Sequence, residues 1–428
     1  MSKIRRYFNT FVLTRGFFIA LLSSAFIYLD YWGFSYPLLN TILGLTSLYL
    51  LLQENEKVWF VSGAFIGLLW FWWIALSLKH YGMLWAIPIE VFIIMLSYGL
   101  IFWLIAWSSE KTVSYLPKKY FKLSLLFKAL GLLGLSYIHP FSFDWLKPEL
   151  MFIESYLGIE KWQFSIILAG IILSIWKQRF IYLLLVVFAY EPHLTKNITI
   201  DENIALVTTY TSVQEKWNKD LHTIQFNTIY NSIDQAISDN KSLIIFPESV
   251  FPVFINRSQK IIDTLQKKAQ HISIVVGGLY WDGKTPRNST YIFTNNTITV
   301  ANKVVLVPFG ESNPLPDFLG DWVNEVFYDG AVDYKASADV IDYKIDNETY
   351  RNAICFEATS EKLYEVSKDE NRPKNMIVLS NNGWFIPSIE PTLQKLLLQY
   401  YSKKYGTTIY HSINMSSSYI IQDGKVFF

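Results

Sequence analysis

The first 191 residues form a series of apolar segments, and this pattern constrains the fold more than any other feature of the chain. They contain 15 Lys/Arg and 10 Asp/Glu, whereas residues 192–428 contain 22 Lys/Arg and 26 Asp/Glu. A transmembrane helix needs about 20 mostly apolar residues. The sequence therefore predicts a membrane part, residues 1–191, and a water-soluble part, residues 192–428, which is long enough to bury a core of its own.

Seven apolar segments of the membrane part are candidate spans. The first four are strong candidates, and the fifth contains Lys128 and two glycines. The last two are short, so that a buried helix or a half-span remains an alternative for them. The candidate spans are residues 10–29, 34–52, 58–78, 83–107, 123–138, 162–176 and 180–190.

The segments between these spans differ in charge. If the N-terminus lies in the cytoplasm, ten Lys/Arg fall in the inner segments and three, Lys79, Lys147 and Lys161, fall in the outer loops. Segments rich in Lys and Arg stay on the cytoplasmic side. An odd number of spans then places residues 192–428 outside the cytoplasm, whereas six or eight spans would place them inside.

Residues 192–428 alternate between strand-like and helix-like segments. Three pairs, Asn295-Asn296, Asp346-Asn347 and Asp423-Gly424, have the composition of tight turns. This order is typical of packed sheets with helices outside them. We expect strands at 203–209, 243–246, 272–278, 291–293, 297–300, 302–307, 340–344, 349–356, 376–379, 410–414 and 418–422, and helices at 217–237, 259–269 and 392–405.

Three chemically useful side chains stand at the ends of these strand-like segments. Glu248 follows one such segment, Lys303 begins another, and Cys355, the only cysteine of the chain, follows a third. Each alone is more often structural: a solvated carboxylate, a strand-edge lysine, a small core residue. Together they could accept the thiol proton, stabilise the thiolate and its oxyanion, and form a thioester with an acyl group.

The residues around this trio resemble the nitrilase (carbon–nitrogen hydrolase) superfamily. With a polytopic N-terminal part, the whole chain resembles the apolipoprotein N-acyltransferase family. Of the matching segments, the one from Lys303 to Glu311 and the one around Trp384 are the most specific for this family. The matching segments are Phe246-Pro247-Glu248, Asn302-Lys303 through Pro308-Phe309-Gly310-Glu311, Ile354-Cys355-Phe356-Glu357 and Ser380-Asn381-Asn382-Gly383-Trp384-Phe385.

The resemblance implies a polytopic α-helical membrane bundle joined to an α/β nitrilase-like four-layer αββα sandwich. The catalytic domain would face the periplasm from a bacterial inner membrane. Glu248 would be the general base, Lys303 the oxyanion stabiliser and Cys355 the nucleophile. The residues that would contact the substrate are Trp217, Glu311, Phe356, Glu357, Trp384 and Phe385, and apolar walls are expected from Phe251 and Ile386 as well.

The chain departs from the family pattern at several positions. Thr208-Thr209-Tyr210 replaces a Gln-x-Asn pattern, Phe356 replaces a Tyr after the nucleophile, and Ile386 replaces a Gly. The loss of the tyrosine removes a hydroxyl donor. Family members usually have an eighth span after the catalytic domain, and we expect none in this chain.

Three functions remain possible for such a chain. The first is an N-acyltransferase that moves a fatty acyl chain from a phospholipid to a diacylglyceryl apolipoprotein. The second is a membrane-tethered amidase or hydrolase of the same superfamily. The third is a non-catalytic scaffold or transporter, which retention of the trio and a lack of paired charges across the spans disfavour.

Nucleic acid, metal and cofactor are not expected as partners. The formal net charge of +1 gives no general reason to expect nucleic acid. The six histidines have no paired-ligand spacing, and a single cysteine excludes a Cys-cluster metal site. The expected partners are therefore the membrane, a phospholipid acyl donor and the apolipoprotein acceptor.

Overall fold

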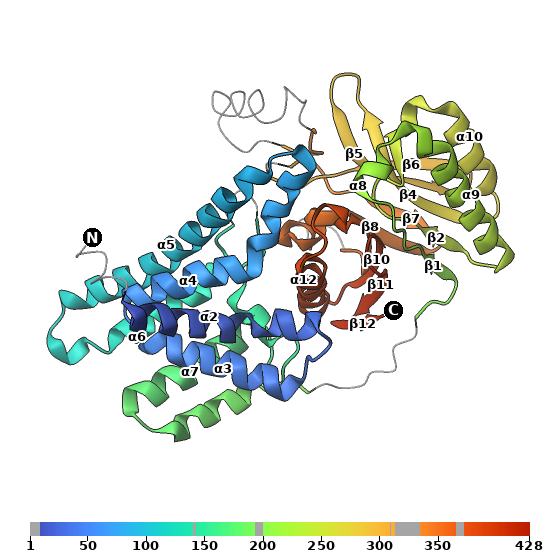
Figure 1. Cartoon of the computed structure of the whole chain (residues 1–428). Helices are drawn as coiled ribbons and strands as arrows, with labels where there is room; N and C mark the ends of the chain where they lie inside the picture. The colour runs from blue at the N-terminus through green and yellow to red at the C-terminus, as the bar shows by residue number, and fades with distance from the viewer. Residues whose placement is uncertain (1–8, 140–142, 193–199, 309, 313–333, 365–371) are drawn as a thin grey trace. The chain divides into compact units, whose positions relative to one another are not determined.

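The computed structural model describes residues 9–139, 143–192, 200–308, 310–312, 334–364 and 372–428 (Figure 1). They fall into two compact units. The first comprises Met1–His139, Trp145–Thr195 and Pro387–Leu396, and the second comprises Pro140–Asp144, Lys196–Ile386 and Leu397–Phe428. Each unit is described by itself below.

The first unit is a bundle of apolar helices, and each of the seven predicted segments is helical in it. Among the described residues, three helical stretches are long and apolar enough to cross a membrane: Thr10–Tyr31, Glu56–Tyr81 and Leu84–Ser114. The remaining helices are shorter than 18 residues, so the number of spans stays a prediction. The helices are α2 (Thr10–Tyr31), α3 (Pro37–Gln53), α4 (Glu56–Phe71), η1 (Trp72–Tyr81), η2 (Leu84–Ala86), α5 (Ile87–Ser114), η3 (Lys118–Tyr120), α6 (Leu123–Leu135), η5 (Pro148–Phe152), α7 (Lys161–Lys177) and η6 (Phe180–Ala189).

Small residues allow α4 and α5 to approach closely. A Cβ on Gly63 would lie 2.6 Å from the carbonyl oxygen of Tyr98, and a Cβ on Gly67 would lie 2.7 Å from the ring of Tyr98. Two glycines four residues apart share one face of a helix, and such pairs let membrane helices pack backbone against backbone. The contact between α4 and α5 therefore depends on these two positions.

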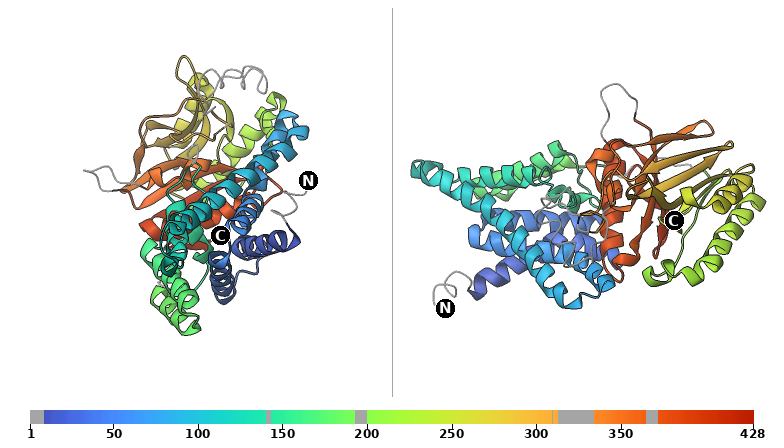
Figure 2. Two further views of the ribbon diagram at one scale, coloured as in Figure 1. Left: turned by 90° about the vertical axis from the view of Figure 1, so that its left-hand side faces the viewer. Right: turned by 90° about the horizontal axis from the view of Figure 1, so that it is seen from above.

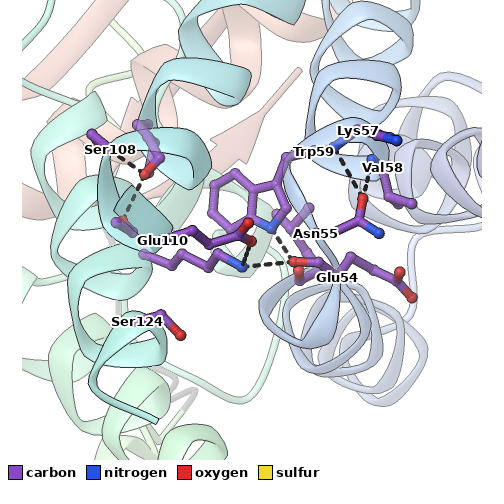
Figure 3. A network of polar contacts seen from close by, with 12 residues as sticks. Glu54, Asn55, Lys57, Val58, Trp59, Ser108, Glu110 and Ser124 are labelled. Carbon is purple, nitrogen blue, oxygen red and sulfur yellow. Dashed lines mark hydrogen bonds and ion pairs between the residues drawn. The ribbon is translucent and has the colours of Figure 1, made fainter. Parts of the chain in front are cut away.

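Charged side chains pair across the helices of this unit, contrary to our expectation. Lys128 of α6 lies 2.7 Å from Glu110 of α5 and donates to the backbone carbonyl of Glu54, also at 2.7 Å (Figure 3). Arg15 of α2 pairs with the Glu54 carboxylate at 2.6 Å. Because such charges are expensive in a membrane unless they are paired, these contacts tie four helices together. The predicted lack of paired charges across the spans, which disfavoured a transporter, is therefore wrong.

The second unit contains two six-stranded sheets. In the first sheet, β1, β2 and β4 are parallel, and in the second β8, β9 and β10 are parallel. The first has the order β1-β2-β4-β5-β6, with β3 beside β4, and the second has the order β12-β11-β10-β9-β8-β7. The strands are β1 (Ile204–Leu206), β2 (Leu243–Ile245), β3 (Phe251–Phe254), β4 (Ser273–Trp281), β5 (Pro286–Thr294), β6 (Thr297–Asn302), β7 (Asp342–Ile345), β8 (Glu348–Ile354), β9 (Asn375–Asn381), β10 (Thr408–Asn414), β11 (Tyr419–Gln422) and β12 (Lys425–Phe427).

Two apolar cores define the layers of this unit. One joins the sheets, with Ile245 and Val275 of the first packed against Ile377 of the second. The other joins the first sheet to the helices α9 (His222–Ser238) and α10 (Gln259–Lys268). Figure 2 shows these helices on the outer side of the first sheet. The second half of α12 (Glu390–Tyr405) hydrogen-bonds to the β11–β12 turn through Gln399, which donates to Gly424. The predicted combination of a helical membrane bundle with an α/β sandwich is thus confirmed.

The predicted elements agree with the structure except at a few positions. Positive φ angles at Asn295, Asn296 and Asp346 confirm the turns. The strand predicted at 302–307 is wrong, because β6 ends at Asn302 and the amides of Val304 and Val305 bond to a side chain rather than to a strand. Strands β3 and β12 were missed, and the helix predicted at 217–237 begins at His222.

Candidate functional site

The three candidate catalytic residues follow strands whose ends lie in one region of the second unit. Cys355 directly follows β8, Lys303 directly follows β6, and Glu248 lies three residues beyond β2. Ser412 ties the sheets together at the ends of β1 and β2, because its hydroxyl donates to the carbonyls of Val207 and Ile245 at 2.7 and 3.0 Å. Segments more than 100 residues apart in sequence are thereby brought into one site.

A buried hydrogen-bond network connects Glu248 to Lys303. The Asn288 amide nitrogen donates to the Glu248 carboxylate at 2.7 Å and to the Glu311 carboxylate at 2.9 Å. Glu311 in turn pairs with the Lys303 ammonium at 2.8 Å and accepts from the backbone N–H of Val307 at 2.9 Å. Each N–H of the Asn288 amide group thus holds one carboxylate.

The charges of this network act on one another in a buried site. Burial alone would lower the pKa of Lys303, which is 1% exposed, but the carboxylates of Glu311 and Glu248 outweigh this effect and raise it. Burial raises the pKa of Glu248, while the charge of Lys303 opposes the rise. Lys303 therefore stays protonated, and Glu248 is a better proton acceptor than an ordinary surface carboxylate.

Cys355 has a strained backbone at the point where the chain turns. It is half-buried, and its φ is +53°, in the left-handed region. This conformation is uncommon for residues other than glycine and often occurs at functional sites. The charges of Lys303 and Lys216 both act on Cys355. The thiol is therefore within electrostatic reach of two cations.

Glu357 joins the Lys303 segment to the Cys355 turn. One carboxylate oxygen accepts from the N–H of Ile354 at 2.7 Å, and the other accepts from Val304 and Val305 at 2.7 and 3.1 Å. Burial raises the pKa of this carboxyl to about 7, although Lys303 and the three amides oppose the rise. Glu357 explains why residues 303–307 are not a strand, since two of their amides bond to it.

Comparisons with known proteins agree with this arrangement. A family model described as the apolipoprotein N-acyltransferase integral membrane domain matches residues 10–192. The apolipoprotein N-acyltransferase of Wolinella succinogenes is 38% identical over 410 residues, which cover 94% of each chain. That of Helicobacter pylori is 35% identical over 90% of this chain and 87% of its own.

The chain belongs to the apolipoprotein N-acyltransferase family. It is therefore an acyltransferase that acts in lipoprotein N-acylation. A CN-hydrolase superfamily protein of Xanthomonas campestris also aligns, at 14% identity and a TM-score of 0.39, over 53% of this chain and 84% of its own. The resemblance to the nitrilase superfamily rests on the sequence motifs around Glu248, Lys303 and Cys355.

The aromatic residues predicted to contact the acyltransferase substrates differ in exposure. Trp217 is 41% exposed, Trp384 and Phe385 are half-buried, and Phe356 is buried in a stack with Phe143, with 5.9 Å between the ring centroids. Their roles stay predictions. Phe251 was assigned wrongly, because it is fully buried in the core between α9, α10 and the first sheet and does not line the site.

One residue of the site was missed in the sequence, and a second was given no role there. Asn288 lies in β5 within a polar Arg-Asn-Ser-Thr run that directly precedes the apolar and aromatic residues Tyr291–Phe293, and this run could have drawn attention to it. Lys216 precedes Trp217 and is 2% exposed. A lysine next to a predicted substrate residue was the available signal. Among the described residues, no group of three or more His, Cys, Asp or Glu could hold a metal ion.

We predict that Glu357→Gln destabilises this acyltransferase and lowers its activity. The glutamine side chain has one oxygen, which accepts, and one NH2 group, which only donates. At least one backbone N–H, at Ile354 or Val304, therefore loses its acceptor. A buried donor left without an acceptor costs about 1–3 kcal/mol. Thermal unfolding of the detergent-purified protein measures the loss, with Glu348→Gln on the exposed β7–β8 hairpin as the control. Unfolding at the wild-type temperature would contradict the assigned contacts.

Proposed function

We propose that the enzyme moves a fatty acyl chain from a phospholipid, through a thioester on Cys355, to the N-terminal amine of a diacylglyceryl-cysteine apolipoprotein. The observation that carries this proposal is the network around Lys303. Asn288 links the Glu248 carboxylate to that of Glu311, and Glu311 pairs with Lys303, whose charge also acts on Cys355. A base, a permanent cation and the chain's single thiol are the groups that an acyl-enzyme mechanism needs.

In the first half-reaction, the Cys355 thiol transfers its proton to the Glu248 carboxylate. The thiolate attacks the carbonyl carbon of the phospholipid ester, and a C–S bond forms. Lys303 stabilises the oxyanion of the tetrahedral intermediate. The C–O bond then breaks, Glu248 returns the proton to the leaving oxygen, and the lysophospholipid departs.

In the second half-reaction, the acceptor amine attacks the thioester carbon. Glu248 takes a proton from the amine nitrogen, the C–S bond breaks, and that proton returns to the Cys355 sulfur. The intermediate must survive until the acceptor arrives, so the site must exclude water. The apolar side chains of Trp384, Phe385 and Ile386 support this requirement, because all three are at least partly buried.

We predict a thioester on Cys355 that an amine resolves faster than water. Protein incubated with acyl-labelled phospholipid should gain a hydroxylamine-sensitive label, and Cys355→Ala should abolish it. The label should persist in buffer and leave rapidly as an N-acyl peptide when a diacylglyceryl peptide with a free N-terminus is added. The same peptide with an acetylated N-terminus is the control.

Two outcomes would contradict this mechanism. Full labelling of Cys355→Ala would exclude the nucleophile assignment. Release of the label as free fatty acid, at one rate with or without peptide, would replace the transferase with a membrane-tethered hydrolase.

We predict that Glu248→Gln and Lys303→Met lose acyl-enzyme formation while remaining folded. Removal of a general base costs about 10²–10⁴ in rate, and removal of an oxyanion donor costs about 10²–10³. Single-turnover labelling of Cys355 measures both losses. Near-wild-type labelling of either variant, with an unchanged unfolding temperature, would reject the role of that residue.

We infer that the catalytic unit faces the periplasm from a bacterial inner membrane. The excess of Lys and Arg in the inner segments supports this orientation, together with the predicted odd number of spans. Reporter fusions after Tyr190 and after Phe428 should give periplasmic signals, with a fusion after Lys57, in an inner segment, as the cytoplasmic control. Cytoplasmic signals at the first two positions would overturn the orientation.

A further inference from the structure

Lys216 is a buried lysine beside Glu248 and Cys355 to which the proposed reaction gives no role. It is the last residue of the short helix α8 (Val213–Lys216) and is 2% exposed. Its ammonium donates to the backbone carbonyl of Glu248 at 3.0 Å. This is the only hydrogen bond of its side chain among the described residues, so two of its three N–H donors have no acceptor there.

The turn that carries Lys216 is held from several sides. Asn414 accepts from the N–H of Thr211 at 3.0 Å and donates to the Asn381 side chain at 2.7 Å. Ser212 and Glu215 then form a reciprocal cap on α8. Because Asn381 ends the strand before Trp384, the position of Lys216 is set by the same loops that form the site.

The charges around Lys216 distinguish it from Lys303. The Lys303 ammonium already has an ion pair with Glu311 at 2.8 Å. Lys216 has no ion pair among the residues with described positions, and a buried ammonium without one is costly. The ionisable groups whose charges act on it are Glu248 and Cys355, and Lys303 and Glu311 act in turn on Glu248.

Burial lowers the pKa of Lys216 to about 8, although the charges of Glu248 and Cys355 oppose the decrease. The ammonium is therefore the main form below about pH 8 and is lost above it. A perturbed group that faces a reactive residue is a candidate for function.

We propose that Lys216 is a positioning residue for acyl transfer, which holds the main chain of Glu248 and places a positive charge opposite the Cys355 thiolate. This inference rests on the proposed function. When the thiol proton moves to Glu248, that carboxylate becomes neutral and the sulfur becomes negative. The charge of Lys216 then balances the thiolate, while Lys303 remains balanced by Glu311. The thiolate thus forms without an uncompensated charge in the site.

The single cysteine allows this inference to be tested without the acyl-transfer reaction. The thiolate is the form that reacts with iodoacetamide, so the pH dependence of alkylation reports on Cys355 alone. A nearby opposite charge shifts a titration by about 1–3 units. We expect Lys216→Met to move the alkylation midpoint upward by about one pH unit or more, and Lys216→Arg to keep the midpoint at or below that of the wild type.

Lys241→Met is the matched control. The Lys241 ammonium also donates to a backbone carbonyl, that of Glu202, but it lies on the surface at the opposite end of β2 from Glu248. Its alkylation profile should coincide with that of the wild type. An unchanged profile for Lys216→Met, with reduced acyl-enzyme formation, would reduce Lys216 to a structural support and overturn the inference.

A second comparison keeps the inference testable if Lys216→Met does not fold. Arginine stays charged at alkaline pH, whereas Lys216 loses its charge as the pH rises through about 8. The alkylation rate of Lys216→Arg relative to wild type should therefore increase between pH 7 and pH 9, and a constant ratio would overturn the inference. Because alkylation needs no lipid, failure here is distinct from failure of the thioester mechanism.

Discussion

The buried ammonium of Lys303 is the interaction on which the rest of the site depends. An isolated charge with 1% exposure would be strongly unfavourable. Glu311 pairs with it, Asn288 connects Glu311 to Glu248, and Glu357 holds the amides that follow it. Each of these partners lies on a different segment, so the need to keep Lys303 charged determines how the segments come together.

The site contains two buried lysines with different tasks, one for the oxyanion and one for the thiolate. Lys303, fixed by Glu311, is a permanent charge suited to an oxyanion. Lys216 has only a main-chain partner among the described residues and loses its charge more readily. A site with one permanent and one adjustable cation can hold a thiol before reaction and a thiolate during it. The charges of both lysines act on Cys355, whose backbone lies in the left-handed region.

Paired charges also connect the helices of the helical unit. Lys128, Glu110, Glu54 and Arg15 connect four helices through two ion pairs and one backbone contact. Glycines on α4 bring α5 close enough for direct packing. Lipid tails are as apolar as the side chains, so the hydrophobic effect contributes little to helix association in a membrane. Ion pairs and close glycine packing do not depend on it.

The sequence by itself determined the two-part organisation, most strands and helices, the family and the three candidate catalytic residues, because hydropathy, turn composition and short motifs are local properties. It did not reveal Asn288 or a role for Lys216, and it assigned Phe251 to a wall of the site. Only the tertiary structure decided these positions. Which carboxylates one amide can bridge, or whether an aromatic ring faces a core or a cavity, depends on distances between strands that the order of residues does not contain. The strand predicted at 302–307 was wrong for the same reason. The amides of Val304 and Val305, which a strand would need for its ladder, donate instead to Glu357, more than 50 residues away.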